Sequence, residues 1–173
     1  NCSSTKTRSS NNIKNMSNKI ENLWSYELIN EESFKFRHEK FQEIIPEGSI
    51  VLDIGAHIGY FSLVFGSCVG DEGRVIAFEP NPKTFDVLKQ HSEKNPLFNI
   101  IPYNVAATPE TKKYTFNYSD PNIYNTGTNG GYFDNLKNGD SIKDFHYHKL
   151  EVDGVNPVDF LNEKHPDLVD KIN

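Results

Sequence analysis

SIVLDIGAHIG, residues 49–59, is the stretch of this sequence that decides its fold. Its first half, Ser49 to Ile54, is short, apolar and rich in β-branched residues, which is typical of a strand buried on both faces. Gly55 then allows a tight turn, and the apolar segment from Gly59 to Val69 is long enough for a helix. A strand, a glycine turn and a helix in this order predict a ligand site at the carboxyl end of the strand.

The same pattern continues along the chain. Arg74 to Phe78 reads as a second buried strand, and Asn81-Pro82 is a typical helix start, because Asn caps the helix and Pro fits its first position. Phe98 to Tyr103 is a third strand candidate, weakened by Pro102 near its end. Strands that alternate with helices imply parallel pairing and right-handed crossovers. We therefore predict an α/β fold with a doubly wound, mostly parallel sheet of the Rossmann-like kind.

The segments on either side of this unit have other patterns. Apolar spacing predicts one or two helices between Ser17 and Ile45. Tyr114 to Tyr118 alternates like a half-exposed strand, and Phe145 to Val152 looks like a return strand. Residues 120–140 are rich in Asn and Gly and read as one long loop, a kind of segment that is often functional. Val158 to Lys164 predicts a short helix.

The composition limits the classes of partner. The chain has 18 Lys and Arg against 24 Asp and Glu, a formal net charge of −6, which disfavours a nucleic-acid substrate. Cys2 lies in a polar stretch and Cys68 in an apolar one, so we expect no disulfide framework. No apolar run reaches the ~18 residues of a membrane span, and no signal peptide is recognised. We expect a soluble, cytoplasmic protein without a nucleic-acid or membrane partner.

The glycine turn excludes two common ligand classes. The dinucleotide fingerprint needs a glycine where this chain has His57, and a phosphate-binding Walker loop needs a Lys-Ser or Lys-Thr that is absent. What remains is an acidic residue two positions before the first glycine, in the pattern Asp53-x-Gly55-x-x-x-Gly59. S-adenosylmethionine carries a cationic ammonium and sulfonium and no phosphate, so a carboxylate near this turn suits it electrostatically.

A second carboxylate follows the second strand. Glu79 stands 26 residues after Asp53, and a carboxylate there can accept hydrogen bonds from both ribose hydroxyls of a nucleoside. Taken alone, Glu79 reads more simply as a solvent-facing acid or a helix-end acid. Its combination with the Asp53 turn favours the ligand-binding interpretation.

Three motifs of this chain resemble those of the FkbM family of methyltransferases. Residues 51–62, VLDIGAHIGYFS, look like the opening motif of that family, residues 73–82, GRVIAFEPNP, like its second motif, and residues 104–107, NVAA, like its third. The resemblance covers Ile50 to Ala107 and extends loosely to Leu161. It implies an S-adenosyl-L-methionine-dependent methyltransferase that acts on a hydroxyl of a small molecule or sugar.

The resemblance and the turn together define the expected site. The expected cofactor-binding residues are Asp53, Gly55, Ala56, His57, Gly59, Glu79, Pro80, Asn104 and Ala106. For His57 the sequence leaves two interpretations open, contact with the cofactor or acceptor and capping of the local backbone. The reaction needs a base to take the hydroxyl proton, and no residue is assigned to that role.

Further candidates lie in the second half of the chain. Asn125 and Gly127 are expected to bind the acceptor substrate as part of a lid, although an ordinary flexible loop explains them equally well. His146 and His148 share one face of a strand and could bind a metal or act as a base. Two histidines without a carboxylate at a fixed spacing are weak evidence, so a solvated strand face is favoured and no metal is expected.

The domain organisation follows from these motifs. We expect a disordered leader at residues 1–16, an N-terminal helical segment at 17–48 and the S-adenosylmethionine-binding domain at 49–173. Lys171-Ile172 resembles the start of a fourth strand, so we expect a domain truncated at its C-terminus, with possible self-association through an unpaired sheet edge. The expected partner is a small-molecule or carbohydrate acceptor. Two rival functions stay open, a methyltransferase of RNA or protein and a non-catalytic binding domain with the cofactor fold.

Overall fold

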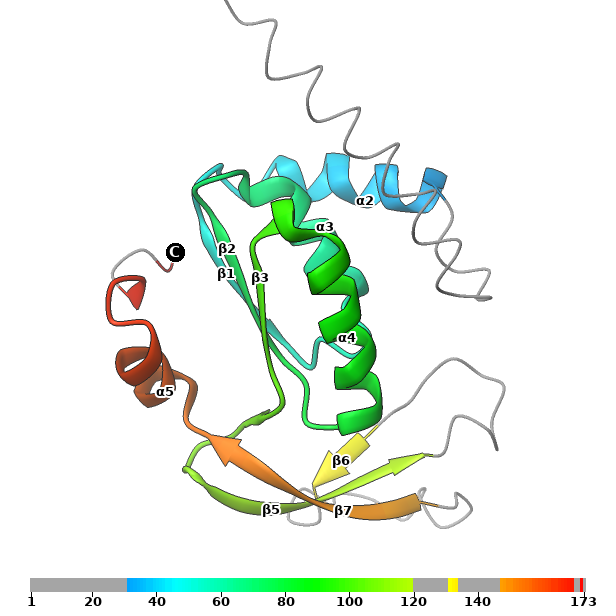
Figure 1. Cartoon of the computed structure of the whole chain (residues 1–173), viewed down its shortest axis with the longest axis vertical. Coiled ribbons are helices and arrows are strands. Elements are labelled where there is room, and N and C mark those ends of the chain that lie inside the picture. Colours follow the sequence, from blue (N-terminus) through cyan, green and yellow to red (C-terminus); the bar gives the residue numbers. More distant parts are fainter. Residues whose placement is uncertain (1–30, 120–130, 134–146, 170–171, 173) are drawn as a thin grey trace, which may run out of the picture.

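The computed structural model of the chain describes residues 31–119, 131–133, 147–169 and 172. It contains two sheets (Figure 1). The first is a three-stranded sheet with helices on both of its faces, and the second is a four-stranded sheet that lies across the carboxyl end of the first. No helix among the described residues is long and apolar enough to cross a membrane.

The first sheet is the predicted parallel one. Its strands are β1 (Ile50–Ile54), β2 (Arg74–Phe78) and β3 (Ile100–Tyr103), hydrogen-bonded in the order β1-β2-β3. Both pairings are parallel, with Asp53 opposite Ala77 in the first of them. The α/β fold class and the parallel pairing predicted from the sequence are therefore confirmed.

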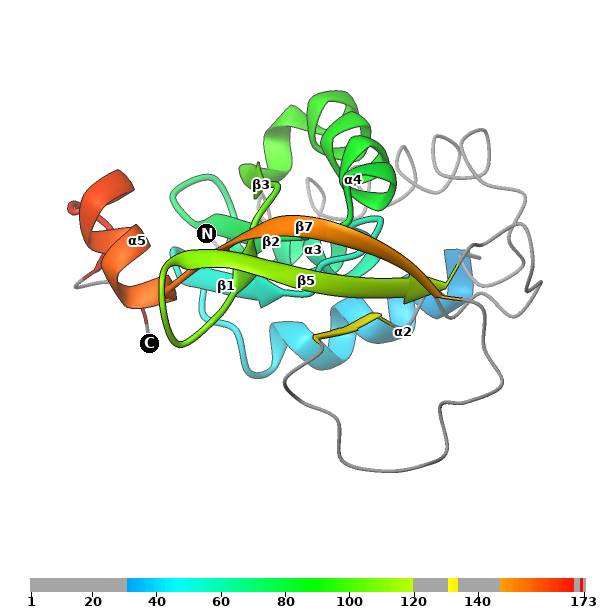
Figure 2. The ribbon, with the colours of Figure 1, turned by 90° about the horizontal axis from the view of Figure 1, so that it is seen from below.

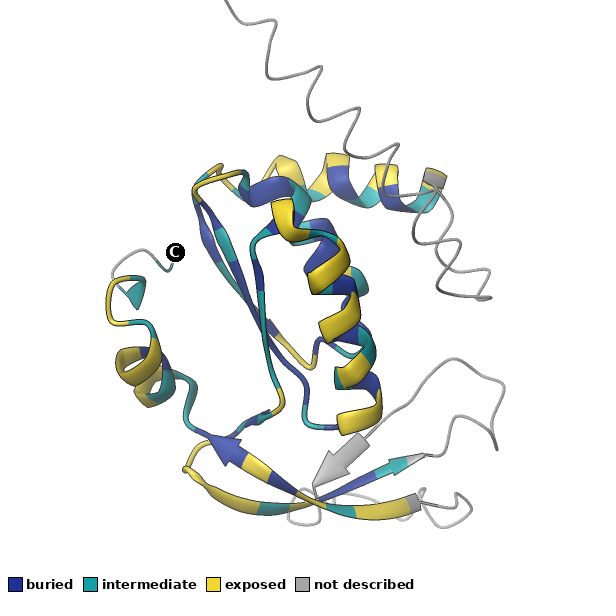
Figure 3. Cartoon of the chain, viewed as in Figure 1, coloured by how far each residue is buried: buried dark blue, intermediate teal, exposed yellow. Residues whose placement is uncertain are grey.

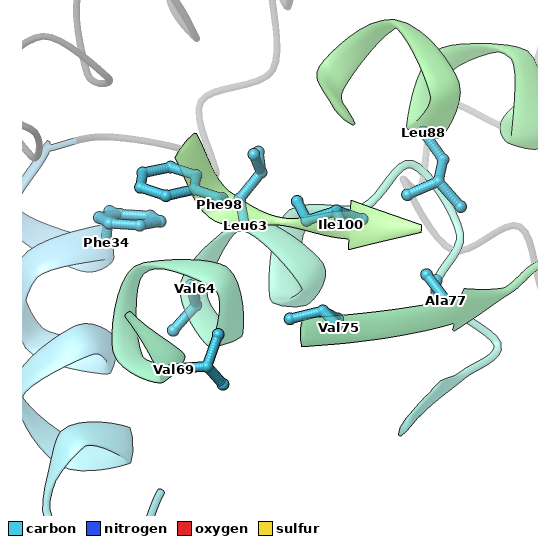
Figure 4. Packing of buried hydrophobic residues seen from close by; sticks show 10 residues of the cluster. Phe34, Leu63, Val64, Val69, Val75, Ala77, Leu88, Phe98 and Ile100 are labelled. Carbon is cyan, nitrogen blue, oxygen red and sulfur yellow. The ribbon is translucent and has the colours of Figure 1, made fainter. Parts of the chain in front are cut away.

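Three helices cover one face of this sheet. They are α2 (Glu31–Gln42), α3 (Tyr60–Val69) and α4 (Pro82–Lys94). Apolar side chains from these helices and from β2 and β3 form a buried cluster (Figure 4). Its fully enclosed members include Leu63, Val64, Val69, Val75, Ala77 and Leu88. On α4 the buried positions face the sheet and the outer positions are exposed (Figure 3), as its amphipathic sequence predicts.

The opposite face of the sheet packs against the last described helix. Helix α5 (Pro157–Lys164) is capped by Asn156, whose side chain accepts hydrogen bonds from two backbone amides of the first turn. Its Leu161 packs on the buried side chains of Ile50, Ile76 and Phe78. Ile172 forms an isolated parallel bridge with Ile50, so it lies at the free edge of β1.

The second sheet contains β4 (Ala106–Ala107), β5 (Lys112–Ser119), β6 (Gly131–Phe133) and β7 (Tyr147–Val155). Its strand order is β4-β7-β5-β6. Strand β5 pairs antiparallel with both β6 and β7, whereas β4 pairs parallel with β7. Figure 2 shows β5 and β7 side by side across the end of the first sheet.

Three expectations need correction. The predicted loop at 120–140 contains strand β6, because the backbone of residues 131–133 finds a partner in β5 despite its Gly-rich sequence. Strand β7 extends to Val155, beyond the predicted end at Val152, because Ala107 pairs with Val155. Phe98 belongs to a short 3-10 turn, Pro96–Phe98, and strand β3 begins only after the left-handed residue Asn99.

Some expectations fall outside the described residues. These are the leader at 1–16, the first part of the helical segment at 17–48, and the acceptor-site candidates Asn125 and Gly127. His146 also lies outside this part of the chain. Within the described residues of this segment, 31–48, the helix α2 ends at Gln42.

Candidate functional site

The turn after β1 joins the carboxyl ends of the first two strands. The backbone amides of Gly55 and Ala56 both donate to the carbonyl oxygen of Phe78, at 2.9 and 3.0 Å. Gly55 has a φ of 77°, in the left-handed region that favours glycine. A Cβ atom added at Gly55 would meet nothing within 4 Å. The backbone of this turn is therefore open to a ligand.

Gly59, at the other end of the turn, is closely packed. Its φ is 87°, and an added Cβ would lie 2.6 Å from Cδ1 of Leu88. Gly59 is one of the residues that the sequence predicted to bind the cofactor. The structure shows that it leaves room for α4, since Leu88 belongs to that helix. Gly59 also caps α3 without a side-chain hydrogen bond, so its contribution to a site is through the backbone.

The carboxyl of Asp53 is buried at the end of β1. The residue is 9% exposed, and Oδ2 accepts a hydrogen bond from the Ser62 hydroxyl at 2.6 Å. Burial raises the pKa of Asp53, and the bond from Ser62 opposes part of that rise. No described residue donates to the other oxygen, Oδ1. Ser62 was missed by the sequence analysis, although a polar residue in an apolar helix was the available signal.

The carboxyl of Glu79 is buried at the end of β2. The residue is 6% exposed. Its Oε2 accepts from the backbone amide of His57 and its Oε1 from that of Asn81, each at 2.8 Å. Burial is the main cause that raises the pKa of Glu79, and the negative charge of Asp53 raises it further. The carboxyls of Asp53 and Glu79 therefore lie close enough to influence each other's charge. Through its two hydrogen bonds, Glu79 also connects the turn after β1 to the turn after β2.

His57 lies in this turn with an unusual backbone. Its φ of 54° is in the left-handed region, which is uncommon for a residue other than glycine and frequent at ligand sites. The bond from its amide to Glu79 holds that conformation. Burial lowers the pKa of the half-buried imidazole and so favours its neutral form.

Two further predicted cofactor residues, Asn104 and Ala106, lie in different places. Asn104 lies near Glu79, because its side-chain amide donates to the carbonyl oxygens of Glu79 and Pro80, at 2.8 and 3.1 Å. It therefore fixes the turn that carries Glu79. Ala106 lies in β4 and packs into a separate cluster with Phe116. The structure does not bring the Ala106 side chain to the turn after β1.

The site carries acidic residues and no basic ones. Residues 53–62 and 79–81 contain two acids and no Lys or Arg. In the described part of the chain, no group of three or more His, Cys, Asp or Glu side chains could hold a metal ion. His148, the described member of the histidine pair, is exposed on β7 with its ring 5.5 Å from that of Tyr118. Two buried acids beside an open backbone turn suit a cationic ligand with hydroxyl groups.

Comparison with solved structures finds partial likenesses to methyltransferases. A SAM-dependent O-methyltransferase from Thermotoga maritima is 18% identical, with a TM-score of 0.45 over 55% of this chain and 37% of that one. An O-methyltransferase from Bacillus cereus, in complex with SAH, is 21% identical, with a TM-score of 0.38 over 54% and 42%. A putative rRNA-methylase from Clostridium thermocellum is 21% identical, with a TM-score of 0.38 over 43% and 42%. This chain spans less than half the length of each.

Comparison by sequence gives a more specific result. A search of curated proteins found no match. The profile of the methyltransferase FkbM domain matches residues 53–168, about two thirds of the chain. The match begins at Asp53, includes Glu79 and the second sheet, and ends after α5. The chain therefore belongs to the FkbM methyltransferase domain family, whose members depend on S-adenosylmethionine.

Proposed function

We propose that this chain binds S-adenosylmethionine at the turn after β1 and takes part in methyl transfer to a hydroxyl of a small molecule or sugar. One observation carries the proposal: the buried acids Asp53 and Glu79 interact electrostatically at the ends of paired strands, beside the open backbone at Gly55. Membership of the FkbM family supports the methyl-transfer chemistry. The acceptor class rests on the family resemblance and on the net charge of −6, which disfavours a nucleic acid.

The residues present fit this ligand. Each carboxylate oxygen can accept about two hydrogen bonds. Each oxygen of Glu79 accepts one from the backbone, and the side chain of Thr84 also bonds to this carboxyl. Acceptor capacity therefore remains for ribose hydroxyls. Oδ1 of Asp53 suits the ammonium group of the methionine part. The first amides of α3 suit its carboxylate, because a helix begins with unpaired N–H groups and a positive dipole end.

In the proposed reaction, the residues of this chain hold the methyl donor in line with the acceptor. When bound, S-adenosylmethionine supplies an electrophilic methyl group on its sulfonium. Glu79 and Asp53 would hold the two ends of the donor, and Asn104 would keep the Glu79 turn in place. Fixing donor and acceptor in line removes much of the entropic barrier to a displacement reaction. The base that takes the acceptor proton is not assigned to a described residue.

Calorimetric titration with a panel of nucleotides tests the proposal. S-adenosylmethionine and S-adenosylhomocysteine are expected to bind, whereas NAD and ATP are not, because their phosphates would face two buried acids without a basic partner. Binding of NAD or ATP in preference to S-adenosylmethionine would contradict the assignment. Release of S-adenosylhomocysteine with sugar or small-molecule hydroxyls, but not with RNA, would then support the proposed acceptor class.

A further inference from the structure

Ser62 is a fully buried polar residue at the first turn of α3. Its exposure is 0%, and its hydroxyl donates to Oδ2 of Asp53 at 2.6 Å. Burying a hydroxyl costs free energy unless it is hydrogen-bonded, so this bond accounts for a serine among apolar neighbours such as Leu63 and Val64. The bond also ties the start of α3 to the end of β1, across the turn that contains Gly55.

Asp53 uses its two oxygens differently. Oδ2 is held by Ser62, and Oδ1 receives no hydrogen bond from a described residue. A carboxylate with one oxygen fixed has a defined rotation, so the direction of its second oxygen is defined as well.

We propose that Ser62 is a positioning residue, whose hydroxyl fixes the Asp53 carboxylate so that Oδ1 meets the ammonium of S-adenosylmethionine. This inference rests on the proposed function and adds to it a residue that acts through Asp53 rather than on the ligand. The hydroxyl has a second effect. Its bond favours the charged form of the Asp53 carboxyl, which burial disfavours. Two more titratable groups belong to the site, Glu79, whose pKa burial and the Asp53 charge raise, and His57, whose pKa burial lowers.

The test is calorimetric titration with S-adenosylmethionine between pH 5 and pH 9. Ser62→Ala is expected to weaken binding at pH 7 by about 3- to 10-fold, since one buried bond to the carboxylate is lost. It should also move the acid loss of affinity to higher pH, because removing the bond raises the pKa of Asp53. Ser62→Cys has nearly the same shape and a weak donor. It should show the same shift, which keeps the test decisive if the alanine variant does not fold.

Ser67→Ala is the matched control. Ser67 lies on the same helix, and its hydroxyl donates to the Val64 carbonyl at 2.6 Å and lies 2.7 Å from Nδ1 of His38. The substitution Ser67→Ala therefore removes a serine hydrogen bond of similar length and leaves Asp53 and its partner Ser62 unchanged. Ser67→Ala is expected to lower the melting temperature while leaving the affinity and its pH dependence unchanged.

A double-mutant cycle identifies Asp53 as the intermediary. In an Asp53→Asn background, Ser62→Ala should cost no further affinity, because the charge that it positions is gone. Binding of 5′-methylthioadenosine, which lacks the amino-acid part, should be unaffected by Ser62→Ala. Equal weakening of both ligands, or full additivity with Asp53→Asn, would overturn the positioning role and leave the proposed function standing. Failure of the wild-type chain to bind S-adenosylmethionine would overturn both.

Discussion

Replacing Glu79 by glutamine tests the second acid of the site with little change in shape. The wild-type carboxylate accepts from the amides of His57 and Asn81 and is proposed to accept from both ribose hydroxyls. In Glu79→Gln one of the two acceptor oxygens becomes an NH₂ group, which can only donate. That group would face one backbone N–H, which would lose its acceptor, and one ribose hydroxyl, which could no longer donate to it.

The expected losses follow from these contacts. A hydrogen bond to a charged group contributes about 1.5–3 kcal/mol. Losing one ribose contact should therefore weaken the binding of S-adenosylhomocysteine by about 10- to 150-fold. A buried backbone N–H without its acceptor costs about 1–3 kcal/mol of folding free energy. Removal of a buried charge offsets part of this cost, because burial raises the pKa of Glu79 and thus disfavours its ionised form.

The assay separates affinity from stability. Calorimetry gives the affinity of the folded variant directly, and melting with and without S-adenosylhomocysteine gives the stabilisation by ligand, which falls as the affinity falls. Glu72→Gln is the matched control, because Glu72 is an exposed glutamate in the turn before β2. The control should bind and melt like the wild type. A folded Glu79→Gln protein with unchanged affinity would refute the assignment of Glu79 to the ribose.

Three further predictions concern the surroundings of the site. Gly59→Ala should destabilise the fold by about 1–3 kcal/mol more than Gly48→Ala in chemical denaturation, because both positions have positive φ but only the first would overlap Leu88; equal losses would contradict the packing role. The raised pKa of Asp53 means that this carboxyl contributes stability when protonated, and the contribution is lost as the pH rises through its folded pKa. Asp53→Asn should therefore gain unfolding free energy relative to the wild type between pH 5 and pH 8, and a relative loss would show that the sign is wrong. Burial raises the pKa of the Cys68 thiol to about 11. In a variant with the other cysteine replaced by serine, iodoacetamide should therefore label the native protein at pH 7.5 far more slowly than the unfolded protein. Comparable labelling rates would contradict this.

The sequence could predict the first sheet because its signals are local. Buried β-branched runs define β1 and β2, and Asn81-Pro82 defines the start of α4. The second sheet could not be predicted in the same way. Its order brings Ala106 next to Gly154 and residue 131 next to Tyr118, and such pairings between distant residues depend on tertiary packing more than on strand propensity.

For the two acids, the sequence could predict their place in the fold. Asp53 lies at the end of β1 and Glu79 directly after β2, on adjacent strands, as expected. The bonds that hold each carboxyl could not be predicted, since the Ser62 hydroxyl and the His57 amide reach their partners only through the exact path of the turn. The close packing of Gly59 against Leu88 could not be predicted for the same reason.

The most direct test of the central claim is a crystal structure of this chain with S-adenosylhomocysteine. We expect the ribose hydroxyls within hydrogen-bond distance of the Glu79 carboxylate, about 2.5–3.0 Å between oxygens. We also expect the amino group of the ligand beside Oδ1 of Asp53 and the ligand next to the backbone of Gly55. A ligand bound elsewhere, or one bound at this turn with its ribose away from Glu79, would contradict the claim.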